Sequence, residues 1–370
     1  MSSKLKIKAN NKIKAYYVFF LIFTLQKGVG IVGYPRVVVE KAGPDAWISL
    51  IIALIFVHIF LQMIIFILRS YDNTDLHGIL EQSLGKWLGK MISLSFMLFY
   101  MTIILSIVVT YVEFVLVFLF PRIQGWFIAG LILLLVIYAV YGGIKAVVGV
   151  SFMFFFSTHW MILLLIEPAM YFNKYNFLPI LDTSFGELMQ GVLVTSYTVT
   201  GFELIWFFYP FIDDKKKVAR YGHLGVAIYG LTILIITVII IGYFSLLELK
   251  EEVWPLLQML KIVKLPLFER FDIIIVGLWM LIILPNLVTL TWIVSFGIKR
   301  ITNLKQKTSL LIISILVFIG SFFLKDRISI NNYNDLVATI SIFYCFGIPL
   351  LLFPFAIIKR RKGKKQNENA

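Results

Sequence analysis

Long apolar runs recur along the whole chain, separated by short polar segments. Each run approaches or exceeds the roughly 20 residues that an α-helix needs to cross a bilayer at about 1.5 Å per residue. The pattern predicts ten membrane-spanning helices, at residues 16–39, 46–68, 90–120, 126–142, 147–171, 187–209, 222–246, 271–297, 308–324 and 335–358. After the second run, leucine recurs at every fourth position from Leu76 to Leu88, which predicts a short helix at the membrane interface.

Composition supports the membrane assignment. Of the 370 residues, 60% are hydrophobic and only 15% are charged, and the mean hydropathy is +0.92. These residues cannot cover a water-soluble surface of this size. The single cysteine, Cys345, lies in the last predicted span and permits no intramolecular disulfide.

The formal charge of +14 is compatible with nucleic-acid binding or with membrane orientation, and its distribution favours orientation. With the N-terminus placed in the cytoplasm, 23 of the 34 Lys and Arg residues fall in inner segments and 10 in outer segments. Both termini are therefore predicted to be cytoplasmic. The basic tail, 359–370, is interpreted as a solvated anchor beside anionic lipid, and no nucleic-acid partner is expected.

The stretch GVGIVG, residues 28–33, has the glycine spacing of a dinucleotide-binding turn but lies inside the first span. No strand and helix unit surrounds it, so the nucleotide interpretation fails. Val29 lies 13 residues into the span, where three glycines and Pro35 weaken the helix. A break at that depth must face protein or a watery cavity. The alternative is that the glycines only allow close helix packing.

The sixth span, ELMQGVLVTSYTVTGFELIWFFYP, carries a second predicted break at matching depth, because Thr200 lies 13 residues after Glu187. Five crossings is an odd number, so a structural repeat over 16–171 and 187–358 would be inverted. The chain, 1–370, is then a single transmembrane domain. Paired broken helices of this kind line midplane sites in transporters, where helix N-termini meet anions and freed carbonyls meet cations.

Candidate ligand-binding residues gather at the two breaks and on the third and eighth spans. They are Gln26, Lys27, Gly28, Gly30, Tyr100, Thr198, Thr200, Gly201, Glu203, Trp279, Asn286 and Thr289. Ionisable groups inside spans are expensive and often mark function. Lys27 is the deepest, with Glu203 as the first expected partner and a backbone carbonyl as the second. Structural roles remain open, namely snorkelling for Lys27, a packed and hydrogen-bonded carboxylate for Glu203, and ordinary packing for the residues of spans three and eight.

Sequence motifs for catalysis are lacking. The chain has no H-E-x-x-H, no paired-cysteine zinc spacing, no G-x-S-x-G and no P-loop, so no catalytic residue, metal or cofactor is predicted. His58 and His159 fall near the centres of their spans and are expected to be neutral, hydrogen-bonded core residues.

Three stretches, YPRVVVEKAGPDAWISL, TVTGFELIWFFYPFI and LPLFERFDIIIVGLWM, resemble the integral-membrane B subunits of spore germinant receptors. That family belongs to the amino acid, polyamine and organocation transporter superfamily, and the likeness extends over the whole chain. It implies an all-α, LeuT-like membrane fold, a place in the spore inner membrane, and sensing of a small nutrient such as an amino acid. The partners it implies are a larger membrane A subunit and a C-subunit lipoprotein.

Three classes of function therefore remain: a ligand-sensing receptor subunit, a free-standing proton- or cation-coupled amino acid permease, and an intramembrane enzyme using Glu203 or His159. For an amino acid ligand, we expect the N–H groups of Gly28 and Gly30 to meet the carboxylate. Carbonyls freed near Thr200, with Glu203, would meet the ammonium group.

Overall fold

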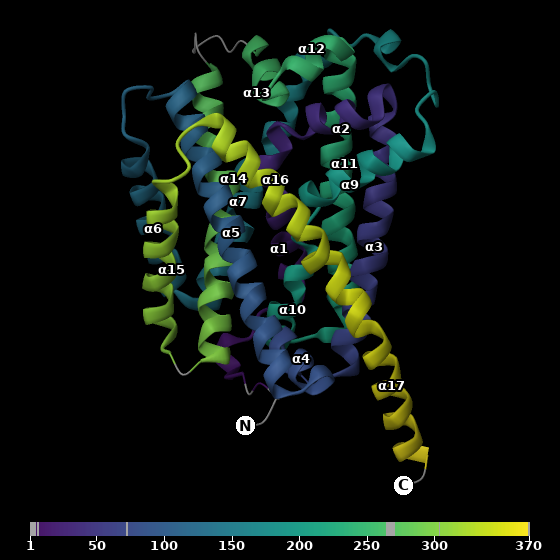
Figure 1. Ribbon diagram of the computed structural model, residues 1–370, viewed down its shortest axis with the longest axis vertical. Helices are drawn as coiled ribbons and strands as arrows, with labels where there is room; N and C mark the ends of the chain where they lie inside the picture. Colours follow the sequence, from purple (N-terminus) through teal and green to yellow (C-terminus); the bar gives the residue numbers. More distant parts are fainter. Residues whose placement is uncertain (1–4, 6, 72, 264–270, 303, 369–370) are drawn as a thin grey trace.

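A computed structural model of the chain describes residues 5, 7–71, 73–263, 271–302 and 304–368. The described part is a helical bundle without β-strands, and its single isolated β-bridge joins Ile13 to Ile212. Figure 1 shows most helices running along the long axis of the molecule. The all-helical prediction is confirmed.

The first five spans occupy the first half of the chain. The first is broken into α1 (Tyr17–Gln26), the 3-10 turn η2 (Val29–Val32) and α2 (Tyr34–Ala42). The others are α3 (Ala46–Ser70), α5 (Lys86–Phe118), α6 (Gly125–Tyr141), and α7 (Gly143–His159) continued through η4 (Trp160–Leu165) into α8 (Ile166–Ala169). Most predicted boundaries agree with these within a few residues.

The other five spans occupy the second half of the chain, and the first of them is again a broken helix. The sixth is broken into α9 (Phe185–Thr198), η6 (Phe202–Leu204), α10 (Ile205–Phe208) and η7 (Tyr209–Phe211). The others are α11 (Val218–Tyr243), α14 (Phe271–Ile301), α15 (Gln306–Ser321), and α16 (Arg327–Ile342) continued through the π-turn η10 (Phe343–Gly347) into α17 (Ile348–Glu368). The last span thus begins earlier than predicted, and the basic tail continues it as a helix.

Length and hydropathy agree with ten crossings. Among the described residues, six helices are long and apolar enough to span a membrane, and α9 with η6–η7 makes a seventh, bent by 47°. Three shorter apolar helices are α1, α6 and α15. The first completes the broken span with α2, and the other two are the predicted short spans four and nine. The discontinuous first and sixth helices of the predicted inverted-repeat fold are therefore present.

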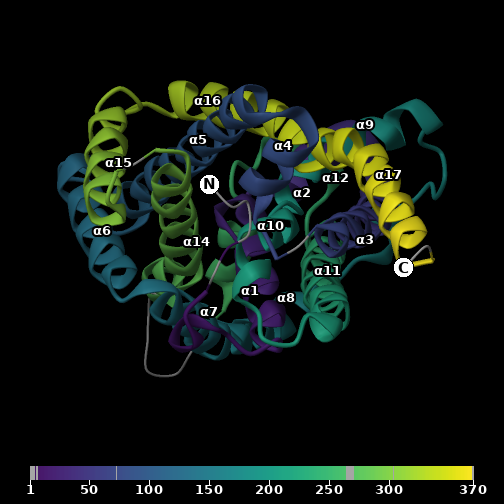
Figure 2. The ribbon, with the colours of Figure 1, turned by 90° about the horizontal axis from the view of Figure 1, so that it is seen from below.

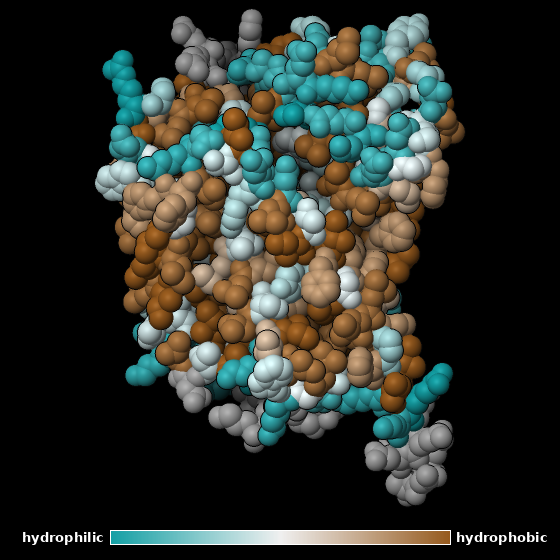
Figure 3. Space-filling model, viewed as in Figure 1, coloured by the Kyte–Doolittle hydropathy of each residue, from teal (hydrophilic) through white to brown (hydrophobic). Residues whose placement is uncertain are grey.

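The surface shows where the membrane lies. In the space-filling view an apolar band crosses the middle of the molecule and polar residues gather at both ends (Figure 3). Both chain termini lie at the same end, which we call the termini end (Figure 1). An even number of crossings produces this arrangement, and the chain is a multi-pass membrane protein.

Short elements cap the two ends of the bundle. At the termini end lies the predicted interfacial helix, α4 (Leu76–Leu84), whose N-cap Asp75 accepts a hydrogen bond from Gly78 N at 3.0 Å (Figure 1). Asp75 also lies 3.1 Å from Arg300 of α14. The remaining short elements are η1 (Ala9–Asn11), η3 (Gly43–Asp45), η5 (Lys174–Phe177), η8 (Lys215–Lys217), α12 (Leu246–Glu251), α13 (Pro255–Met259) and η9 (Leu260–Ile262).

Helix α1 is the central element of the bundle. It contacts α11, α7 and α14, and the view from below shows it surrounded by other helices (Figure 2). Val18 and Phe23 of α1 are fully buried. The first break therefore lies in protein surroundings, where unpaired backbone groups can be met by side chains instead of lipid.

Candidate functional site

The first helix break follows directly from the backbone of two residues. Helix α1 ends at Gln26 because Lys27 leaves the helical region, with φ −83° and ψ 86°, and Gly28 is extended, with φ −116° and ψ −162°. The chain then resumes helical turns at Val29. The prediction of a break at this depth is confirmed, although neither Gly28 nor Gly30 has a positive φ.

The second break does require glycine. After α9 ends at Thr198, Gly201 has φ +114°, a conformation that residues with a Cβ rarely adopt. A Cβ at Gly201 would lie 2.9 Å from the carbonyl carbon of Leu25 and 3.0 Å from Gln26 N. The backbones of the two breaks are therefore in direct contact, and only a residue without a side chain fits between them.

Three side chains donate hydrogen bonds to backbone carbonyl oxygens near the two breaks. Asn286 of α14 directs its amide nitrogen to Thr24 O at 3.0 Å and Lys27 O at 3.1 Å. Gln26 Nε2 donates to Val199 O at 2.7 Å, and the Tyr229 hydroxyl donates to Thr198 O at 2.8 Å. Asn286 was a predicted site residue, whereas Tyr229 was missed because its position within an otherwise regular span gives no signal.

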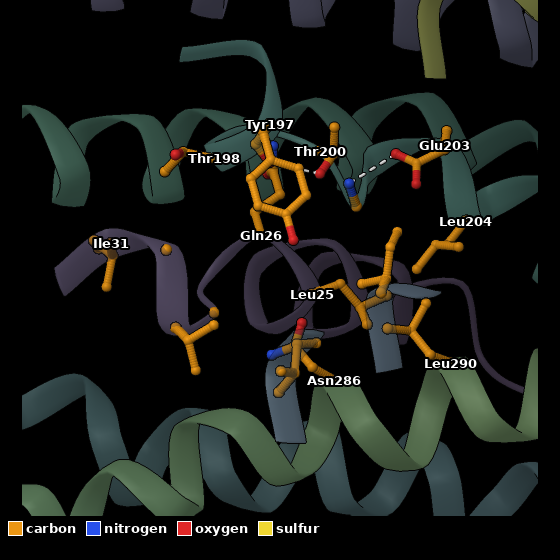
Figure 4. A pocket seen from close by; sticks show the side chains of 16 residues that line it. Leu25, Gln26, Ile31, Tyr197, Thr198, Thr200, Glu203, Leu204, Asn286 and Leu290 are labelled. Atoms are coloured by element: carbon orange, nitrogen blue, oxygen red, sulfur yellow. Dashed lines mark hydrogen bonds between the residues drawn. The ribbon is translucent and has the colours of Figure 1, made fainter. Parts of the chain in front are cut away.

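A small cavity of about 60 Å³ lies between the two breaks (Figure 4). Eight of the predicted site residues line it: Gln26, Gly28, Gly30, Thr198, Thr200, Gly201, Glu203 and Asn286. The remaining lining is mostly apolar and comes from α1, η2, α5, η6 and α14, with Tyr197 of α9 added. We call this space the break cavity.

Two acceptors at the break cavity stand out. Glu203 is 2% exposed, and its Oε2 accepts a hydrogen bond from Gly201 N at 2.7 Å (Figure 4). The thiol of Cys345, in the π-turn η10, interacts with the same carboxyl group. The side-chain oxygen of Gln26 is buried and has no hydrogen-bond partner in the described part of the chain. Cys345 was missed, since its sequence position does not reveal a π-turn.

Lys27 is buried as predicted, but its partner differs from the first expectation. Its Nζ donates to Thr158 O of α7 at 3.3 Å, so a backbone carbonyl takes the place expected for Glu203. Lys27 does not line the break cavity. Its side chain instead ties the first break to the fifth span.

The other predicted wall residues lie in helix packing outside the break cavity. Tyr100 of α5 and Trp279 and Thr289 of α14 are buried and absent from the cavity lining. The Tyr100 ring packs edge-on against Phe207 with centroids 5.8 Å apart. The polar atoms of these three side chains have no partners among the described residues.

The two histidines differ. His58 Nδ1 lies 2.9 Å from His223 Nδ1, so the expectation of a hydrogen-bonded side chain is confirmed for His58. His159 stacks on Phe155 with centroids 4.9 Å apart, and its Nδ1 has no partner in the described part of the structure. Within the described residues no group of three or more His, Cys, Asp or Glu side chains could hold a metal ion.

A larger cavity of about 580 Å³ adjoins the break cavity and shares Val29, Gly30, Tyr197 and Thr198 with it. We call it the vestibule. It extends past Ser106 to Arg36 and Arg327 at the end of the bundle opposite the termini. The polar face of the tenth span that lines it was not recognised in the sequence, because the span was predicted to begin only at residue 335.

Side-chain hydrogen bonds hold the vestibule walls together. Ser106 Oγ of α5 donates to Asn334 Oδ1 of α16 at 2.6 Å, and Asn334 Nδ2 donates to Thr110 Oγ1 at 3.1 Å. Nearer the opening, Arg327 pairs with Glu113 at 2.8 Å. These bonds place α16 across the vestibule and against α5.

The arrangement of helices is similar to that in solved structures, among them a symporter. A Na⁺-coupled sialic acid symporter superposes with a TM-score of 0.66 at 16% identity, covering 89% of this chain and 76% of that chain. MhsT in complex with L-phenylalanine superposes with a TM-score of 0.64 at 12% identity, covering 94% and 98%. At these identities the likeness establishes the LeuT-like fold alone.

Sequence relatives are more specific. Spore germination protein GerQB from Bacillus cereus is 35% identical over 96% of this chain and 99% of its own length. Spore germination protein A2 from Bacillus subtilis strain 168 is 26% identical over 95% and 97%. Residues 12–330 match the sequence profile of the family described as spore germination protein. The chain belongs to the spore germination protein family.

Proposed function

We propose that this chain is the membrane subunit of a spore nutrient-germinant receptor, and that it binds a small nutrient, such as an amino acid, in the break cavity to trigger germination. The observation that carries the proposal is the contact of two broken helices around a cavity lined by Gln26, Gly30 and Glu203. Family membership supports the role in germination.

The cavity offers complementary groups for a zwitterion. The unpaired Gln26 Oε1 and the Glu203 carboxyl are acceptors for an ammonium group. For the carboxylate, Gly28 N is not free, because it donates to Gln26 O at 3.1 Å. Donors are therefore expected from the start of η2, around Gly30, which lines the cavity. At about 60 Å³ the cavity favours a small ligand, or one whose side chain reaches into the vestibule.

The proposal includes an orientation of the chain in the membrane, with the termini end in the cytoplasm. Both termini lie at one end of the bundle, and the basic residues concentrate there, which supports a cytoplasmic termini end (Figure 1). The vestibule then opens away from the cytoplasm, toward arriving nutrient. A larger membrane A subunit and a C-subunit lipoprotein are the proposed partners in the spore inner membrane.

The second candidate is a free-standing proton- or cation-coupled amino acid permease. It is favoured by the fold shared with solved symporters and by the vestibule that leads to the break cavity from one side. Uptake of labelled amino acid by the purified chain alone in liposomes would support the permease. Ligand response only together with co-purifying subunits would support the receptor.

A germination assay tests the main proposal. Spores lacking this chain are exposed to a panel of amino acids, sugars and nucleosides, beside spores in which the chain is restored. Loss of the response to one nutrient, regained on restoration, identifies both ligand and role. Unchanged germination with every nutrient would contradict a receptor role for the panel tested.

A further inference from the structure

The described residues that precede α1 cross the termini end of the bundle and bind a segment far away in the sequence. We call Leu5 and residues 7–16, which lead into α1, the N-terminal strap. Ile13 N donates to Phe211 O at 2.9 Å, and Asp213 N donates to Ile13 O at 3.0 Å. These bonds form the parallel bridge between Ile13 and Ile212. The strap thereby joins the start of α1 to the end of η7.

Asp213 is the centre of this attachment. Its Oδ1 accepts a hydrogen bond from Ala15 N at 3.1 Å, and its Oδ2 lies 3.2 Å from Lys14 Nζ. Burial raises the pKa of Asp213, but hydrogen bonds from Asp214 N, Lys14 and Ala15 N outweigh it and hold the pKa below its ordinary value. Ile13 and Ala15 are buried, so the strap is packed as well as hydrogen-bonded.

Two further contacts fix the strap across the bundle. Leu5 N donates to Asn73 O at 3.2 Å, and Asn73 Nδ2 donates to Leu5 O at 3.0 Å, which ties the strap to the segment after α3. Lys145 Nζ of α7 donates to Asn10 Oδ1 at 2.9 Å. The strap therefore contacts the termini ends of the second, fifth and sixth spans in addition to its own.

The elements that the strap joins also bound the break cavity. On the far side the break cavity continues into the vestibule. On the side of the strap, the chain from η6 to η7 is packed without exposed side chains, and Trp206 and Phe208 are at most 1% exposed. Because α1 and η6 both line the break cavity, separating α1 from η6–η7 would open the cavity toward the termini end, and the Ile13 and Asp213 contacts hold these elements together.

We propose that the N-terminal strap is a latch that keeps the break cavity closed at the termini end, and that release of the strap from Asp213 opens this end. The latch acts on the conformation of the bundle and operates in a receptor or a permease. It therefore extends beyond the proposed function and is measurable without a ligand.

Site-directed thiol labelling tests the latch. A reporter cysteine, Leu290→Cys, is placed in the lining of the break cavity in a Cys345→Ser background, in sealed vesicles of known orientation. A membrane-impermeant maleimide is added on the termini side. Asp213→Ala removes the acceptor for Ala15 and Lys14 and should raise the labelling rate about tenfold, which corresponds to about 1.4 kcal/mol. Asp213→Asn keeps an acceptor without the charge and should give an intermediate rate.

The neighbouring carboxylate provides the matched control. Asp214 binds Lys216 N at 3.1 Å and Lys217 Nζ at 3.0 Å within its own segment, and among the described residues its carboxylate has no bond to the strap. Asp214→Ala should leave the labelling rate nearly unchanged. The latch is refuted if Asp213→Ala does not speed labelling from the termini side, if Asp214→Ala speeds it equally, or if labelling from the vestibule side rises by the same factor.

Discussion

Gly201 is the position at which a single methyl group should separate the two helix breaks. In Gly201→Ala the new Cβ would lie 2.9 Å from the Leu25 carbonyl carbon and 3.0 Å from Gln26 N, which are backbone atoms and cannot rotate away. The φ of +114° adds conformational strain. A strained non-glycine residue costs roughly 1–3 kcal/mol, and overpacking costs roughly 1–3 kcal/mol.

The expected loss is therefore roughly 2–6 kcal/mol, a large part of the 5–15 kcal/mol that stabilises a typical domain. Part of it would be relieved by moving the end of α1 away from Gly201, which would stretch the bond from Gln26 to Val199 O. Thermal unfolding of the purified protein in detergent should show a midpoint lower by roughly 5 °C or more. The nutrient response of spores carrying the variant should fall with it.

Gly149→Ala is the matched control, because a Cβ at Gly149 meets nothing within 4 Å and its φ is not positive. Alanine is the better helix former by about 1 kcal/mol, so this variant should be neutral or slightly stabilised. If Gly201→Ala unfolds at the same temperature as Gly149→Ala, the two breaks are not in the contact described, and the reasoning is wrong.

Four further predictions follow from the same geometry. In Gly30→Ala the new Cβ would lie at an ordinary contact distance of 3.7 Å from Thr198 Oγ1, so the amount of protein should not change. The nutrient concentration for half-maximal germination should rise about tenfold or more. If only the amount of protein falls, Gly30 is a packing residue. Lys27→Ala removes the link to Thr158 O and should impair the nutrient response more than the membrane level measured by immunoblot; equal losses would indicate a structural role. Asn286→Leu leaves Thr24 O and Lys27 O without their hydrogen-bond donor. Each unpaired carbonyl costs roughly 1–3 kcal/mol, so the unfolding midpoint in detergent should fall. An unchanged midpoint would show that water replaces the amide. Burial is the main cause that lowers the pKa of His77 in the interfacial helix α4 below the ordinary 6.5. The unfolded chain therefore binds this proton more readily, and the folded protein loses stability as pH falls below 6.5. His77→Gln should make the unfolding midpoint depend less on pH in this range.

Local composition was enough to determine the spans and their breaks. Apolar length identifies a spanning helix wherever it occurs, because the bilayer imposes nearly the same length on every crossing. Glycines and a proline at residues 28–35 lower helix stability by themselves, and the interruption beside Gly201 can be recognised in the same way. The family could also be inferred from three short stretches, two of which lie at these breaks. All of these signals lie within short segments of the chain.

Tertiary structure alone decided which groups meet. Lys27 binds Thr158 O, 131 residues away, and Asn286 reaches Thr24 O, 262 residues away. Whether Tyr100 faces a cavity or packed rings depends on the rotation of α5 about its axis, which its neighbours set. The strap bridge from Ile13 to Ile212 likewise forms only when the bundle is assembled. The sequence predicts that buried polar groups must find partners, but the identity of each partner is decided by the packing of distant helices.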